Sequence, residues 1–190
     1  LKRLARELYA VVPAGQSTDR FQPDAFLVAH ALRPDGVFSH HCALELMGAA
    51  HSQWNEYTIL TENRRPPLAL HTARVRFLEH PVSLRKRGDE LLGTRQVERS
   101  GQLLRHTGPE RTLVDGFRRL DLVGGLPELL ESVGGFPSLD LDLLDVLLER
   151  YATSYLWAAV GWYLERHAKT FYVTEEYLER FTIQCPKMPQ

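Results

Sequence analysis

Two histidines, a cysteine and a glutamate lie close together in residues 39–45, SHHCALE. All three residue types bind zinc and related metals. His41 and Glu45 are four residues apart, so on a helix they would share one face, and a metal would need a third ligand from elsewhere. The alternative is a structural helix with Ser39 as its N-cap and Cys42 packed as a small apolar residue. We expect the structural helix and no metal site.

A second group of residues that could take part in chemistry lies in residues 103–119, LLRHTGPERTLVDGFRR. Arg111, Asp115 and Arg119 repeat at intervals of four, which predicts a charged ladder on a helix, opposite its apolar stripe. Asp115 as a general base would need a histidine or second carboxylate within helical reach, and the segment supplies neither. The chain also contains no P-loop and no G-x-S-x-G motif. The sequence therefore predicts a non-catalytic protein without a cofactor.

The same segment carries the signals of a helix start. Thr107 and Glu110 have the spacing of a capping box, in which the hydroxyl and the carboxylate bond reciprocally to backbone N–H groups. Pro109 fits the first helical turn, where a missing N–H costs nothing. Leu113 and Phe117 then form a buried stripe. We expect a capped helix that joins two parts of the protein.

The predicted elements are a mixture of strands and helices in the first half of the chain and helices alone in the second half. Strands are predicted at 8–12, 56–60 and 73–79, and a hairpin at 94–106 turns at Ser100-Gly101. Helices are predicted after Pro23 and over the segment that Ser39 caps, where Leu44 faces the core and Gly48 ends the helix. Further helices follow at 126–133, 140–152, 155–168 and 174–182. This order indicates an α+β protein: a small mixed strand and helix segment followed by a C-terminal bundle of helices.

The charge is distributed unevenly along the chain. The net charge is −1, but residues 1–119 carry 18 Lys and Arg against 13 Asp and Glu, and residues 120–190 carry 5 against 11. A basic front half is typical of proteins that contact nucleic acid. The densest basic run, at 84–88, and a second at 63–67 are predicted to lie in loops, where such side chains reach phosphates or are simply solvated.

Composition limits the remaining classes of function. No apolar run approaches 18 residues, so we expect no membrane span. The two cysteines, Cys42 and Cys185, are far apart, as is usual in a reducing compartment, and we expect a cytoplasmic protein. Trp157, Gly161 and Leu164 share one face of the predicted helix at 151–167, which indicates either a core or a partner surface.

The motifs together resemble the AbiEi antitoxins of bacterial abortive-infection toxin–antitoxin systems. The resemblance rests on LARELYAVVP, on PDGVFSHHCALELMGAA and on LRHTGPERTLVDGF followed by helices, in pieces from about residue 4 to residue 170. Two departures stand out: Glu7 replaces the glycine of the family's R-G-L-Y strand, and Gly108 replaces the hydroxyl residue before the proline. The positions that match the family's structural motifs are Ser39, Leu44, Gly48, Thr107, Pro109, Glu110, Arg111, Leu113 and Asp115.

The resemblance implies a transcriptional repressor that binds inverted repeats in the operator of its own operon. It also implies that the protein counteracts a nucleotidyltransferase-like toxin without forming a stable complex. Residues 1–15 would be the end of the wing of an N-terminal winged helix-turn-helix whose recognition helix precedes Leu1, and residues 16–190 the antitoxin domain. Phosphate contacts are expected from Lys2, Arg3, Arg6, Arg85, Lys86 and Arg87. The alternative is a protein-interaction module, such as a homodimer, with no nucleic-acid role in this portion.

Overall fold

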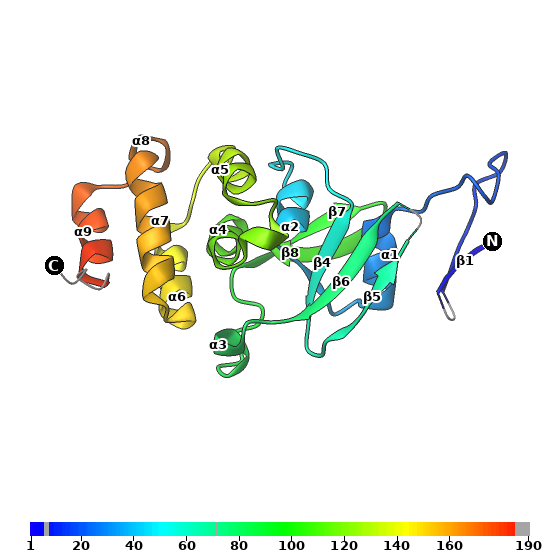
Figure 1. Ribbon diagram of the computed structural model, residues 1–190, viewed down its shortest axis with the longest axis horizontal. Helices are drawn as coiled ribbons and strands as arrows, with labels where there is room; N and C mark the ends of the chain where they lie inside the picture. Colours follow the sequence, from blue (N-terminus) through cyan, green and yellow to red (C-terminus); the bar gives the residue numbers. More distant parts are fainter. Residues whose placement is uncertain (6–7, 71, 185–190) are drawn as a thin grey trace.

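A small hairpin forms one end of the molecule (Figure 1). The computed structural model describes residues 1–5, 8–70 and 72–184, so Arg6 and Cys185 lie outside the described residues. Strand β1 (Lys2–Ala5) pairs antiparallel with β2 (Leu8–Ala10), which is shorter than the predicted strand at 8–12. This two-stranded sheet is separate from the main sheet.

The main sheet has six strands in the order β5-β6-β4-β3-β8-β7. The pairs β4–β6 and β3–β8 are parallel and the other pairs are antiparallel. The predicted hairpin is confirmed: β7 and β8 pair antiparallel across Ser100 and Gly101, which both have positive φ (52° and 78°), as in a type I′ turn. The strands are β3 (Val37–Phe38), β4 (Glu56–Thr61), β5 (Arg65–Ala69), β6 (Arg74–Glu79), β7 (Thr94–Arg99) and β8 (Gln102–Thr107).

Strand β5 lies in a stretch that is predicted from the sequence to be a loop. Pro66 and Pro67 cannot donate to a strand ladder, which argues against a strand inside a sheet. The structure places them on the edge strand, where both are exposed and only β6 is a partner. The prediction was wrong here because an edge position tolerates prolines that a central strand excludes.

Helix α1 (Ala25–Leu32) packs against the sheet and builds the first core. Asp24 is its N-cap and accepts a hydrogen bond from the Phe26 amide at 2.8 Å, so Pro23 precedes the cap instead of opening the first turn. The first core consists of apolar residues from α1, the sheet and helix α2 (His41–Leu46): Phe26, Ala29, Phe38, Cys42, Ile59, Val75, Phe77 and Leu104.

The later helices form the second core and the opposite end of the molecule (Figure 1). The helices predicted from residue 107 onward are confirmed within one or two residues. They are α4 (Pro109–Arg118), α5 (Leu126–Gly134), α6 (Leu141–Tyr151), α7 (Ser154–Arg166) and α9 (Glu175–Gln184). The short helices α3 (Val82–Arg85), η1 (Leu120–Leu122) and α8 (Ala168–Phe171) were not predicted. The fold is α+β, with the sheet first and the helices last, as predicted.

None of the helices in the described part of the chain is long and apolar enough to cross a membrane. Helix α4 lies between the sheet and the helical half and contacts α2, β8, α5, α6 and α7. The helix with the Arg111 and Asp115 spacing is therefore the connection between the two cores.

Candidate functional site

The start of helix α2 differs from the prediction. Its N-cap is His40, which has φ 58° and ψ −129° and makes no side-chain capping bond. Ser39 is therefore not the N-cap, and its hydroxyl instead lies 2.8 Å from Nδ1 of His40. A non-glycine residue with this backbone geometry is strained, and the strain is tolerated where the surrounding packing fixes it.

His41 has a different carboxylate neighbour from the predicted Glu45. Its Nε2 lies 3.4 Å from Oε1 of Glu128 on α5, and its ring stacks on Trp54 at 5.0 Å between centroids. Among the described residues there is no cluster of three potential metal ligands. Cys42 is buried in the first core and is 1% exposed, so its packing role is confirmed.

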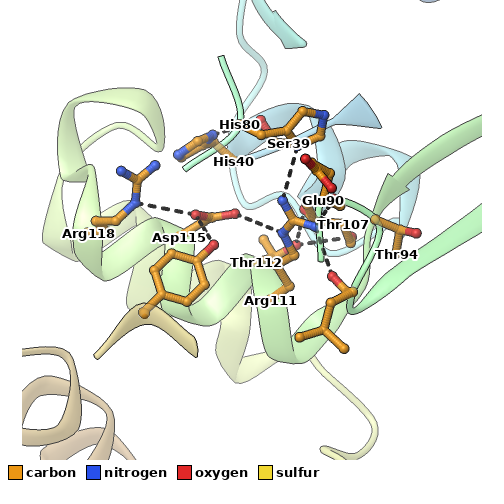
Figure 2. A network of polar contacts seen from close by, with 12 residues as sticks. Ser39, His40, His80, Glu90, Thr94, Thr107, Arg111, Thr112, Asp115 and Arg118 are labelled. Carbon is orange, nitrogen blue, oxygen red and sulfur yellow. Dashed lines mark hydrogen bonds and ion pairs between the residues drawn. The ribbon is translucent and has the colours of Figure 1, made fainter. Parts of the chain in front are cut away.

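Arg111 lies at the centre of a buried polar network (Figure 2). Its Nη1 donates to the backbone carbonyls of Glu90 at 2.6 Å and Leu92 at 2.8 Å. Its Nε faces Oδ2 of Asp115 at 3.4 Å, and its Nη2 lies 3.5 Å from Nδ1 of His80. The guanidinium thus fixes the loop that follows α3 against helix α4.

Asp115 receives contacts from two helices. Its Oδ1 accepts a hydrogen bond from the Tyr151 hydroxyl of α6 at 2.7 Å and faces Nε of Arg118, on its own helix α4, at 3.5 Å. Arg119 pairs with Asp121 instead, so it is not part of a ladder with Asp115. The predicted pairing of Arg111 with Asp115 is confirmed, and both side chains are 0% exposed although the pair lies opposite the predicted apolar stripe.

The protonation states in this network follow from burial and neighbouring cations. Burial alone would raise the pKa of Asp115, but Arg111 and Arg118 lower it below its usual value, so the carboxylate is ionised. Burial lowers the pKa of His40 to about 4. Burial together with the nearby Arg111 lowers the pKa of His80 to about 4 as well. Both imidazoles are therefore neutral at pH 7.

The start of α4 does not have the predicted capping box. The N-cap is Gly108, without a side-chain capping bond, and Pro109 stands in the first turn as predicted. The Thr107 hydroxyl lies 2.7 Å from that of Thr112. Glu110 is 1% exposed, and it accepts a hydrogen bond from the Asp140 amide at 2.9 Å instead of bonding to the start of its own helix.

The remaining residues of the two motifs have the expected structural roles. Leu44 and Leu113 are 0% exposed and belong to the second core. Gly48 has φ +70° just after α2 ends, a conformation that favours glycine. The Ala49 amide then donates to the Leu44 carbonyl at 2.8 Å, which closes the helix end. These positions specify the fold and present no reactive group to solvent.

Tyr151 and His80 belong to the network but were not predicted from the sequence. Tyr151 lies 36 residues from Asp115 and His80 lies 31 residues from Arg111. No local spacing connects them, since only the packing of α6 and of the loop after β6 on α4 brings them together. A network of this kind joins the sheet to the helical half.

The predicted phosphate-contacting residues that the structure describes lie in two separate places (Figure 1). Lys2 is on the terminal hairpin, and its Nζ donates to the Phe21 carbonyl at 2.8 Å. Arg3 is exposed on the same strand. The run 85–87 instead begins at the end of α3, where Arg85 pairs with Glu79 at 2.9 Å. The structure thus brings the members of each group together but leaves the two groups apart.

Lys86 and Arg87 follow directly after α3, and both are exposed. Within the part of the chain that the structure describes, neither side chain forms an ion pair, in contrast to Arg85, so their charges face solvent. They are the members of the basic run that are best placed to approach a phosphate backbone.

The face of α7 that contains Trp157 belongs to the core. Trp157 is 8% exposed, Val160 and Leu164 are fully buried, and a Cβ on Gly161 would lie 2.9 Å from the Phe181 side chain of α9. The core interpretation of this face is therefore confirmed. Tyr155 and Trp162 are the aromatic residues that α7 leaves partly exposed.

No family model matches this chain, and no curated protein matches it. Among solved structures, the chain is similar to the RV2827C protein from Mycobacterium tuberculosis, with 16% sequence identity and a TM-score of 0.50. The match covers 88% of this chain and 60% of that protein. At this level of identity the similarity concerns the fold alone.

Proposed function

We propose that this chain is a non-catalytic regulator of the AbiEi antitoxin type, which represses its own operon and counteracts a nucleotidyltransferase-like toxin. The residues that match the family's motifs support this proposal through their position. Arg111 and Asp115 are buried and bonded to backbone and side chains on both sides of α4. This placement suits a motif that maintains a two-part architecture better than one that turns over a substrate.

The separation of charge along the long axis is the observation that carries the DNA-binding part of the proposal. The hairpin, α1 and the sheet lie toward one end of the long axis and α7–α9 lie at the other, whereas α2 contacts α4 and α3 contacts α6 (Figure 1). The excess of Lys and Arg in residues 1–119 is therefore largely separated in space from the excess of Asp and Glu in residues 120–190, although α3, which Lys86 and Arg87 follow, contacts α6. DNA is attracted to one half and repelled by the other, which orients the protein on the duplex.

A titration of duplex DNA from the region upstream of the gene, at several salt concentrations, tests this proposal. Lys86→Glu/Arg87→Glu should weaken binding and reduce the slope of log K against log salt by about 2, one for each phosphate that is no longer neutralised. The matched control is Arg166→Glu/Lys169→Glu, which changes the net charge equally on the exposed surface of the acidic half. If both variants weaken DNA binding equally, the loss of affinity is due to net charge alone, and Lys86 and Arg87 do not belong to the DNA interface.

The antitoxin activity needs a separate test. Cells that express the nucleotidyltransferase-like protein of the same operon should stop growing, and co-expression of this chain should restore growth without the two proteins co-purifying. Both activities place the protein in the cytoplasm. Absence of rescue by a chain that is folded and expressed would contradict the antitoxin assignment.

A homodimeric interaction module is the second candidate, favoured by the exposed aromatic residues of α7. Tyr155 is 55% exposed and Trp162 is 37% exposed, and their spacing of seven places them on one face of the helix. Sedimentation of Tyr155→Ala/Trp162→Ala against the wild type distinguishes the candidates. Loss of a wild-type dimer in this variant supports the module, whereas a wild-type monomer at all concentrations excludes it.

A further inference from the structure

A hollow of about 410 Å³ opens beside the C-terminal end of α2 and the start of β4. Its walls come from the end of α2, the segment that follows it and the first residues of β4. Small-ligand sites are hollows of about this size in which a few polar groups stand beside apolar and aromatic walls. The residues that line it are Glu45, Gly48, Ala50, Ser52, Gln53, Trp54, Asn55 and Tyr57.

Of the described residues that line the hollow, Glu45 alone carries a charge. Its side chain is half-buried and forms no hydrogen bond or ion pair within the described ranges of the chain. Arg99 is the nearby cation, but its Nε is bonded to Asp24 at 2.6 Å and its guanidinium lies over the Phe26 ring at 4.8 Å. The carboxylate of Glu45 is therefore partly desolvated without a cation bonded to it.

The aromatic walls of the hollow are held in place by their neighbours. Trp54 stacks on His41 on one side of its ring, at 5.0 Å. The Tyr57 ring packs edge-on against Phe26 at 4.9 Å. Both residues line the hollow, and these ring contacts fix their side chains there. Asn55, with an amide that can accept or donate, also lines it.

This set of groups matches one kind of ligand. A carboxylate accepts two N–H bonds from a guanidinium or one from an ammonium, with the charge assisting each bond. The face of a tryptophan attracts the same cations, and the phenol and amide oxygens accept further N–H groups. An anion would instead meet Glu45 without a compensating cation.

We propose that this hollow is a binding site for an organic cation with N–H donors, a guanidinium or an ammonium group. Glu45 pairs with the charge, Trp54 packs against the cation, and Tyr57 and Asn55 accept its remaining N–H groups. The site is separate from Lys86, Arg87 and the hairpin, and it does not depend on DNA binding. The cation belongs to a small amine or to an arginine or lysine side chain of a partner protein, two sources with the same chemistry.

A bound cation would also change the pKa of Glu45. Burial raises its pKa, Arg99 opposes this and Asp24 adds to it. A bound cation would favour the charged carboxylate and lower this pKa.

Calorimetric titration of the full chain with agmatine and with N-acetyl-arginine amide tests the proposal, with the Trp54 indole N–H resonance as an independent readout. Glu45→Gln keeps the size of the side chain and should weaken both ligands at least about tenfold, as expected for one charge-assisted hydrogen bond. Tyr57→Phe keeps the ring packing on Phe26 and should weaken binding less. Glu98→Gln is the matched control, because Glu98 is exposed on β7 outside the hollow, and it should bind as the wild type does.

The two ligands also distinguish the sources of the cation. Tighter binding of agmatine assigns the site to a free amine, and tighter binding of the arginine amide assigns it to a partner's side chain. Binding of neither ligand to the wild type, or equal binding to Glu45→Gln, would overturn the proposal.

Discussion

Substitution of Asp115 by asparagine should destabilise the protein strongly, because it leaves a buried cation without a counter-charge. Asparagine has nearly the same size as aspartate, so packing around α4 is retained. Arg111 would keep its bonds to the Glu90 and Leu92 carbonyls but would no longer face a buried carboxylate at position 115. The Tyr151 hydroxyl would exchange a charged acceptor for a neutral one.

The expected decrease in the free energy of unfolding is about 3–5 kcal/mol, the range for removing one partner of a buried ion pair. Urea unfolding at pH 7, followed by circular dichroism, measures it. The double variant Arg111→Met/Asp115→Asn should be destabilised by less than the sum of the single variants, since neither charge is then left alone. The matched control is Asp121→Asn, which removes the exposed partner of Arg119 and should cost less than about 1 kcal/mol. A cost below about 1 kcal/mol for Asp115→Asn would show that the buried pair does not stabilise the connection between the cores.

Three further predictions concern acid stability, thiol reactivity and packing. Burial lowers the pKa values of His40 and His80 to about 4 in the folded protein, whereas both protonate near pH 6.5 when unfolded. The free energy of unfolding should therefore fall as the pH drops from 6.5 to 4, by up to about 3 kcal/mol for each histidine. Urea midpoints that do not change over this range would contradict this prediction. Cys42 is buried, and burial raises the pKa of its thiol. Peptide mapping should therefore find Cys42 unmodified by a thiol reagent in the native protein and modified in urea. Rapid modification of Cys42 in the native protein would show that the first core opens. Gly36→Ala should lower stability by about 1–3 kcal/mol in urea unfolding, since its Cβ would lie 2.5 Å from a methyl carbon of β4, whereas Gly134→Ala, with nothing within 4 Å, should be tolerated.

The helices after residue 107 and the β7–β8 hairpin were predictable because their signals are local. Apolar residues at helical spacing and the Ser100-Gly101 pair act within a few residues of one another. The edge strand β5 was not predicted, because prolines exclude a central strand but not an edge one, and the order of strands is a property of the whole sheet. Local patterns thus indicate the elements but not their neighbours.

The network around Arg111 and Asp115 also shows that local sequence patterns do not predict tertiary neighbours. Arg111 and Asp115 at a spacing of four predict a pair, and the pair is present. The same spacing is usual on exposed faces, so it could not show that these two side chains are fully buried. Their burial depends on Tyr151 and His80, which are distant in sequence and contribute groups that compensate a charge in the core.

The prediction of a capping box at the start of α4 was wrong for a related reason. Glu110 has the correct spacing to bond to its own helix, yet its carboxylate bonds to the Asp140 amide at the start of α6. A buried carboxylate is stabilised by whichever donors the tertiary fold provides, and the nearest donor in sequence is not always the nearest in space.

Expression from a reporter joined to the chain's own upstream region is the decisive measurement for the regulatory role. We predict that the wild type represses the reporter, that Arg166→Glu/Lys169→Glu represses it equally, and that Lys86→Glu/Arg87→Glu relieves repression at the same protein level. Full expression of the reporter in the presence of folded wild-type protein would contradict a role in repression.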